Sequence, residues 1–211
     1  INTVVVSFVG AVIAVGLALP IAALTSRFRN RKSAAIESLS YSGLALPGVV
    51  IGLSLVFLSI NVFPAIYQSF FLLAFAYAVL FLPKSLGASR SAFESTPPVL
   101  EQVARSLGKK PMSAWVFTTG RLSLTGVAAG GLLVMLTSMK ELPATLMLRP
   151  TGFETLATEL WNRTELAAYG AAVPYALALI AVAAIPAFLL SKAILVTKSE
   201  EKRPTEISIS A

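Results

Sequence analysis

The sequence predicts an all-α membrane protein in which five helices cross a bilayer and one short polar helix lies between two of them. Three observations carry this prediction. The 211-residue chain is 56% hydrophobic and only 13% charged, and its mean hydropathy is +0.79, which is too apolar for a soluble domain of this size. Several apolar stretches are long enough to cross a hydrocarbon core about 30 Å thick. The basic residues also gather in the loops on one side of these stretches.

Five apolar stretches are expected to span the membrane, because a helix rises about 1.5 Å per residue and each stretch is then long enough to cross. They cover about residues 2–25, 36–60, 69–86, 122–139 and 168–196. The polar loop 97–121 joins the third span to the fourth. We expect residues 1–197 to form one transmembrane domain and the polar segment 198–211 to be a disordered cytoplasmic tail.

The distribution of charge predicts the orientation of the spans. All but three of the 17 lysine and arginine residues fall on the same side as loop 97–121, and the exceptions are Arg149, Arg163 and Lys140. Because cytoplasmic loops carry an excess of Lys and Arg, we expect the N-terminus outside and the C-terminus in the cytoplasm. An external N-terminus without a charged leader needs an earlier span, so we expect this chain to be a piece of a longer polypeptide.

Missing residue types limit the chemistry of the chain. The sequence contains no Cys, no His and no Asp, which excludes disulfides, thiolate or imidazole metal sites, and catalysis that needs these side chains. Most of the few Glu residues lie in predicted loops, so we expect no enzymatic activity, no metal site and no bound cofactor. The net charge is +7, and the basic residues lie in loops beside apolar spans. This distribution indicates how the protein is oriented in a membrane rather than nucleic-acid binding.

The loop between the third and fourth spans contains an amphipathic helix. Val99, Val103 and Leu107 recur at four-residue steps and form one apolar stripe. Two prolines, at 97 and 98, suit a helix start, and Gly108 suits a helix end. Two interpretations stay open: a helix that docks a soluble partner, or an interfacial helix that rests on lipid.

Proline interrupts the second predicted span. Pro47 and Gly48 stand at its centre and should break the helix inside the membrane. Irregular backbone at that depth is tolerated where it is buried in protein or lines a water-filled path. The segment could therefore contribute to a translocation pathway, or it could be a simple proline kink.

Charged residues follow the fourth predicted span directly. Lys140 and Glu141 are costly to bury in lipid, so each should face a cavity or a partner. Pro143 should stop the helix. We expect these residues to form a bend in the outer half of a pathway, near a gate; the alternative is a plain helix end with both charges among lipid headgroups.

The amphipathic loop resembles the cytoplasmic EAA coupling loop of ATP-binding-cassette (ABC) importer permeases. The shared elements are the glycine after the helix and the position of the loop between two spans. When the sequences are aligned on Gly108, the family's glutamate falls on Gln102 and its two alanines on Val103 and Ala104, while Glu101 is one position early. The family's Leu-Pro element falls on Gly120 and Arg121, so that element is missing.

A second stretch narrows the resemblance. Residues 139–150, MKELPATLMLRP, followed by GFETLAT at 152–158, are similar to the permeases of ferric-iron importers. The resemblance implies an all-α permease of the type I importer fold, here the C-terminal half, in a cell inner membrane. It implies three protein partners: a cytoplasmic ABC ATPase dimer, a second permease half and a periplasmic substrate-binding protein. The residues that it assigns to ATPase coupling are Glu101, Gln102, Val103, Ala104, Arg105, Ser106, Leu107 and Gly108.

The sequence leaves other functions open. The same kind of permease could carry thiamine, a phosphonate or a polyamine instead of ferric iron. A secondary transporter driven by an ion gradient is a different class, but its usual internal repeats are not visible here, and a scaffold protein would not need the coupling pattern. The chain has no G-x-x-x-x-G-K-[ST] nucleotide-binding motif, so we expect ATP hydrolysis to belong to a partner.

Overall fold

The protein is described here by a computed structural model that covers residues 1–28 and 30–201, with side-chain surroundings as far as residue 192. Within these ranges every regular element is a helix, so the predicted all-α fold class is confirmed. The helices are α1 (Asn2–Arg27), α2 (Arg31–Tyr41), α3 (Gly48–Val62), α4 (Phe70–Glu94), α5 (Val99–Ser106), α6 (Pro111–Trp115), α7 (Leu124–Ser138), α8 (Pro143–Leu148), α9 (Leu156–Glu165) and α10 (Tyr169–Glu201), with 3-10 turns η1 (Ser42–Leu44) and η2 (Pro64–Ile66) and a π-helix, η3 (Val116–Gly120).

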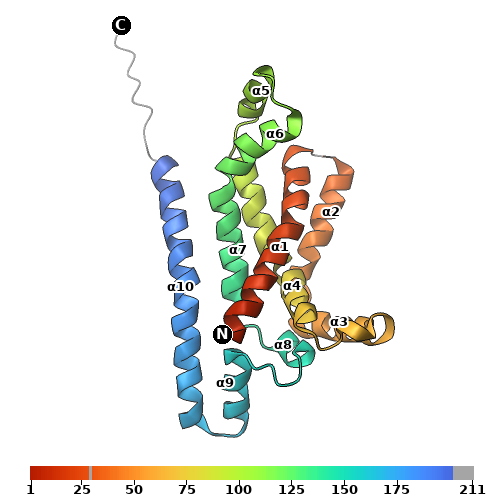
Figure 1. Ribbon diagram of the computed structural model, residues 1–211, viewed down its shortest axis with the longest axis vertical. Helices are drawn as coiled ribbons and strands as arrows, with labels where there is room; N and C mark the ends of the chain where they lie inside the picture. Colours follow the sequence, from red (N-terminus) through yellow and green to blue (C-terminus); the bar gives the residue numbers. More distant parts are fainter. Residues whose placement is uncertain (29, 202–211) are drawn as a thin grey trace.

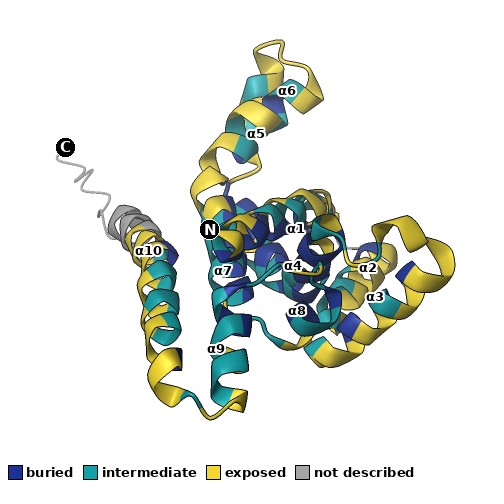
Figure 2. Ribbon diagram, turned by 60° about the horizontal axis from the view of Figure 1, so that its bottom comes forward, coloured by how far each residue is buried: buried dark blue, intermediate teal, exposed yellow. Residues whose placement is uncertain are grey.

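Helices α1, α4 and α7 pack together and form the centre of the molecule (Figure 1). Small residues allow their close approach. A Cβ added at Gly126 would lie 2.5 Å from the Cβ of Ala92, and one added at Gly130 would lie 2.9 Å from the Cβ of Ala88. Small side chains let membrane helices come close enough for extensive van der Waals contact. Most buried residues accordingly lie in these three helices and α8, as Figure 2 shows.

Three single helices are long and apolar enough to cross a membrane: α1, α4 and the Tyr169–Lys192 part of α10. Two further spans are possible if each of two bent helix pairs counts as one, which gives up to five among the described residues. The five predicted spans therefore correspond to three continuous helices and two broken ones. α4 continues to Glu94, and the predicted third span therefore runs directly into a polar extension.

The second predicted span, 36–60, is not one helix. The α2–η1 segment and α3 meet at an angle of 105°, so the interpretation as a simple proline kink is wrong. Pro47 adopts an extended conformation, with φ −60° and ψ 143°, and stands immediately before α3; residues before a proline are themselves biased away from the helical region. α3 then leaves sideways (Figure 1) and packs on α8, where Gly52 faces Ala144 and Met147.

The fourth predicted span, 122–139, is also shorter and bent. Regular α-helix begins at Leu124 and ends at Ser138. The segment before it, α6 with η3, meets α7 at 66°. Pro111 is the first residue of α6, where a proline needs no N–H partner. Trp115 of α6 packs edge-on against Phe93 of α4, with the ring centroids 5.5 Å apart.

The C-terminal part is a helical hairpin of α9 and α10. Thr155 begins α9 with a capping box: its hydroxyl accepts from the backbone N–H of Thr158. α10 extends to Glu201, so residues 198–201 of the expected tail are helical, and residues 202–211 lie outside the described part of the chain. Only 6% of the apolar stretch of α10 is buried, against 56% for that of α4. Most residues of α10 are therefore not covered by the bundle.

Candidate coupling site and translocation residues

α5 is a short helix whose two ends match the sequence prediction. Pro98 stands immediately before its first residue. Gly108 has a φ of +82°, and two hydrogen bonds close the end: the N–H of Gly108 donates to the carbonyl of Arg105, and that of Lys109 donates to the carbonyl of Ala104. This is a Schellman motif, in which glycine takes the left-handed conformation at low cost.

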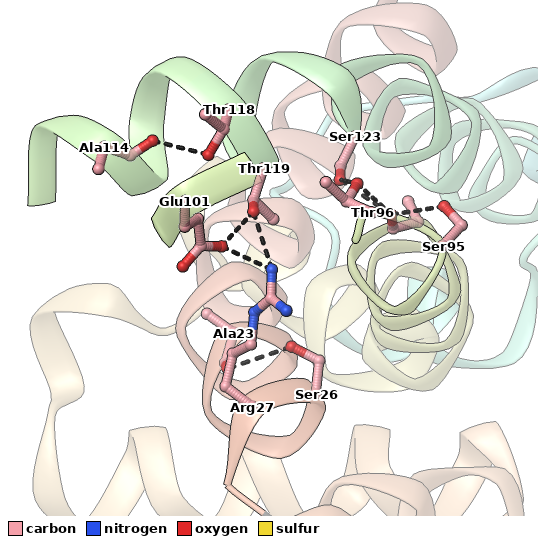
Figure 3. Close-up of polar contacts among 11 residues, drawn as sticks. Ala23, Ser26, Arg27, Ser95, Thr96, Glu101, Ala114, Thr118, Thr119 and Ser123 are labelled. Carbon is pink, nitrogen blue, oxygen red and sulfur yellow. Dashed lines mark hydrogen bonds and ion pairs between the residues drawn. The ribbon is translucent and has the colours of Figure 1, made fainter. Parts of the chain in front are cut away.

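Glu101 is bound by residues from two other elements (Figure 3). Nη2 of Arg27, the last residue of α1, lies 2.6 Å from Oε1 of Glu101 and 2.9 Å from the hydroxyl of Thr119 in η3. The hydroxyl of Thr119 also donates to the same carboxylate oxygen. We call Arg27, Glu101 and Thr119 the polar joint, because they tie α5 to α1 and to the segment that leads into α7.

The polar joint changes the role expected for Glu101. The sequence predicted that this carboxylate would contact a partner, but in the structure it is only 22% exposed and paired within the chain. Arg27 was assigned only a role in orienting the spans, and Thr119 was not singled out. No local sequence pattern identifies this cluster, because its members lie 74 and 18 residues from Glu101.

The apolar stripe of α5 faces away from the bundle. Because successive helical residues are about 100° apart, Val103 points about 160° away from Glu101, which faces the bundle. The exposed fractions of Val99, Val103 and Leu107 are 59%, 51% and 79%, and no residue of α5 is buried. We call Val99, Val103 and Leu107, together with the exposed Met112 of α6, the coupling face. α5 and α6 project beyond the bundle (Figure 2), and an exposed apolar surface of this kind indicates an interaction site.

The remaining predicted coupling residues are arranged around this face. Gln102, Arg105, Ser106 and Gly108 are exposed, and Ala104 is partly buried. The hydroxyl of Ser106 donates to the carbonyl of Val103 within the helix. Within the described part of the chain, Glu101 is thus the only predicted coupling residue whose side chain forms a hydrogen bond or ion pair with another element.

The predicted pathway residues are brought together only in part: Gly48 lies beside Glu141, whereas Lys140 does not join them. A Cβ added at Gly48 would lie 3.0 Å from Oε1 of Glu141, and the same oxygen accepts a hydrogen bond of 3.1 Å from the N–H of Ala144. The carboxylate therefore lies beside the first residues of both α3 and α8, where the helix dipoles favour negative charge. Pro47 is exposed on the turn before α3.

Pro143 does not end the fourth span as predicted. α7 already ends at Ser138, and Pro143 is instead the first residue of α8. Lys140 is exposed and does not join Glu141; it lines a cavity between α7, α9 and α10.

Tyr77 is a residue of this region that the sequence analysis did not single out. Its hydroxyl lies 2.6 Å from that of Thr145 in α8, and the Thr145 hydroxyl donates to the carbonyl of Glu141 over 2.7 Å. A buried tyrosine needs a hydrogen-bond partner for its hydroxyl, so a lone tyrosine within an apolar span was the available signal. This chain of hydrogen bonds connects α4 to the bend at Glu141.

Helices of membrane-crossing length, packed through small residues, define a multi-pass membrane protein, here with an exposed amphipathic helix outside the bundle. Over 202 residues, the chain is 31% identical to the probable molybdenum ABC transporter permease protein of Haloferax volcanii; the match covers 92% of this chain and 73% of that protein. The chain belongs to the permease proteins of ABC transporters.

Two further comparisons agree with this assignment. The chain is 40% identical over 191 residues to the Fe(3+)-transport system permease protein FbpB 2 of Haemophilus influenzae, covering 90% of this chain but only 38% of that protein. The chain thus spans less than half the length of that relative. The fold matches a chain of the MetNI methionine ABC transporter in an inward-facing conformation, with a TM-score of 0.71, 16% identity and 92% of each chain covered. No family model matches the chain.

Proposed function

We propose that this chain is one permease half of an ATP-driven importer and that its coupling face docks a cytoplasmic ATPase dimer. The exposed apolar stripe of α5, held outside the bundle, is the observation that carries the proposal. We propose with it that the α5–α6 end lies in the cytoplasm and the N-terminus of α1 on the periplasmic side of a cell inner membrane. When a protein partner covers such a surface, apolar side chains leave water and the free energy falls.

The polar joint explains how docking could move the spans. When the ATPase closes on ATP, the docked α5 is displaced. Because Glu101 is tied to Arg27 and Thr119, the displacement reaches α1 directly and α7 through η3. A rigid-body tilt of these helices would then alternate between inward-open and outward-open states. Two coupling faces are needed for two ATPase subunits, so the unit includes a second permease half.

We propose ferric iron as the cargo, because the relative with the higher identity is named a ferric-iron transport permease. This chain offers no Cys, His or Asp as iron ligand, so a periplasmic binding protein would capture the cargo and deliver it. The chain itself would need no resident cofactor, and the partner ATPase would hydrolyse ATP. Another small solute, such as molybdenum in a transportable form, is the second candidate, because the other relative is named for that element.

Leu107→Glu, on the coupling face, is expected to lower co-purification of the ATPase with the assembled permease by roughly tenfold or more, because docking would bury a charge in place of an apolar side chain. Gln102→Glu is the control: it adds the same charge to the same helix, outside the stripe, at the position where the resemblance expects glutamate, so it should keep the ATPase. Undiminished binding in Leu107→Glu would show that α5 rests on lipid instead.

Gly108→Arg is expected to uncouple ATP hydrolysis from uptake, because any side chain there must adopt a φ of +82° at a cost of about 1–2 kcal/mol and the turn that ends α5 would distort. Gly152 has a similar φ of +78° and equally open surroundings, but lies before α9. Gly152→Arg carries the same local cost and should leave coupling intact. Equal coupling ratios in the two variants would contradict a role for the α5 turn.

A further inference from the structure

A cavity of about 340 Å³ lies between the end of α7, helix α9 and helix α10. Its walls are mostly apolar and include Leu142, Leu160, Trp161 and Leu179. Lys140 is its only charged lining residue, and Thr164 supplies a hydroxyl. Apolar walls of low dielectric concentrate the field of a charge, so a single ammonium group dominates the electrostatics of this space.

The charge of Lys140 is not neutralised within the described part of the chain. No hydrogen bond or ion pair joins it to another described residue. The neighbouring carboxylate, Glu141, is turned toward Gly48 and the start of α8. On α9, Glu159 pairs with Arg163 at 3.6 Å and does not line the cavity.

A second lysine adds to the positive charge of this region. Lys84 of α4 does not line the cavity, but its charge acts on that of Lys140. The Lys84 side chain contacts the face of the Phe81 ring, with Nζ 5.0 Å from the ring centroid, and has no acidic partner among the described ion pairs. A lysine within a spanning helix is costly unless it faces water or a partner, so Lys84 needs polar surroundings between the helices.

One wall of the cavity belongs to the apolar stretch of α10. Leu179 is ten residues after Tyr169, the first residue of α10, so it stands about 15 Å along that helix. It also falls well inside the apolar stretch Tyr169–Lys192. Lys140 therefore lies beside apolar surface, where a charge without a partner is costly.

We propose that Lys140 and Lys84 form a positively charged part of the translocation path and that the solute passes it as an anion. This inference rests on the proposed importer function and deepens it. If ferric iron is the cargo, it would pass with anionic ligands that outweigh its charge, not as a bare cation. A free oxyanion would also be attracted by the two lysines because of its negative charge. The transport measurements below distinguish it from an iron complex.

The positive charge of the cavity can be tested by labelling a cysteine placed in it, without knowledge of the cargo. The native chain contains no cysteine that would react as well. Thr164→Cys places one thiol in the cavity of the assembled transporter, and the mass of this chain reports its reaction with anionic and cationic methanethiosulfonates of similar size. After correction for their rates with a free thiol, the anionic reagent is expected to react faster. Lys140→Gln should reduce this preference roughly five-fold, the effect of one unit charge several ångströms away in a partly hydrated site.

Lys192→Gln provides the matched control for that measurement. Lys192 also lies on a spanning helix and over an aromatic ring, with Nζ 5.1 Å from the Phe188 centroid, but it does not line the cavity. It should leave the reagent preference unchanged. Equal corrected rates for the two reagents, or a preference that persists without Lys140, would overturn the inference.

Uptake by vesicles that contain the complete transporter and its binding protein then identifies the anion. Labelled iron is supplied as its complex with labelled citrate, which serves as the anionic probe, and both labels are expected to enter in an ATP-dependent way. Lys84→Gln and Lys140→Gln should lower uptake, whereas the Arg variants should retain it.

Iron entry without citrate at the wild-type rate would overturn the passage of a citrate complex, and full uptake by both Gln variants would overturn the role of the lysines. Absence of any iron uptake would refute iron as the cargo, and uptake of labelled molybdate in its place would identify a free oxyanion.

Discussion

Glu101→Ala is expected to lower ATP-driven uptake by at least about tenfold while the ATPase stays bound and continues to hydrolyse ATP. The substitution removes the carboxylate that joins Arg27 and Thr119 to α5, but it leaves the coupling face intact. Hydrogen bonds to charged groups contribute about 1.5–3 kcal/mol. Because Arg27 and Glu101 are 19% and 22% exposed, solvent screening places the expected loss toward the lower end of that range.

A charge-swapped double variant tests whether pairing itself matters. Arg27→Glu combined with Glu101→Arg restores an ion pair between α1 and α5 and should recover part of the uptake that each single variant loses. Uptake and ATP hydrolysis are measured on the same vesicles, and their ratio gives the coupling. Wild-type coupling in Glu101→Ala would show that the polar joint does not transmit the movement of α5.

Gly126→Leu is expected to destabilise the whole helical bundle. The added Cβ would lie 2.5 Å from the Cβ of Ala92 and 3.6 Å from its Cα, so the clash involves the α4 helix itself rather than a flexible side chain. Overpacking of this kind costs about 1–3 kcal/mol or more. In detergent, the melting temperature should fall by roughly 5 °C or more, with less protein recovered in the monodisperse form.

Gly16→Leu is the control for that substitution. Gly16 is also a glycine of a spanning helix, but a Cβ added there would meet nothing within 4 Å. Its melting temperature should stay close to that of the wild type. If both variants melt alike, the contact between α7 and α4 does not depend on glycine at position 126.

The helix ends were the part of the fold that the sequence predicted best. Pro98 and Gly108 act on backbone groups within a few residues, so local chemistry alone is enough to place the ends of α5. The 105° bend before α3 was not predicted, although Pro47 indicated a break. Its angle depends on the packing of α3 against α8, and these segments are almost 100 residues apart in the sequence.

The candidate coupling site was predicted in part for the same reason. The periodicity of Val99, Val103 and Leu107 indicated a shared apolar face, and all three are exposed together. The same periodicity placed Glu101 on the opposite side but could not identify what it would meet there. Arg27 ends a span that lies far earlier in the chain, and only the folded bundle brings its guanidinium group to the carboxylate.

The low burial of α10 has a consequence for how the protein is made. α10 leaves the ribosome after α1, α4 and α7, and these three helices already bury their facing surfaces against one another before it is complete. A lipid-exposed helix satisfies its own backbone hydrogen bonds, so α10 can enter the bilayer as an independent unit. It can then associate sideways with that core, so its arrival is not a condition for the earlier steps.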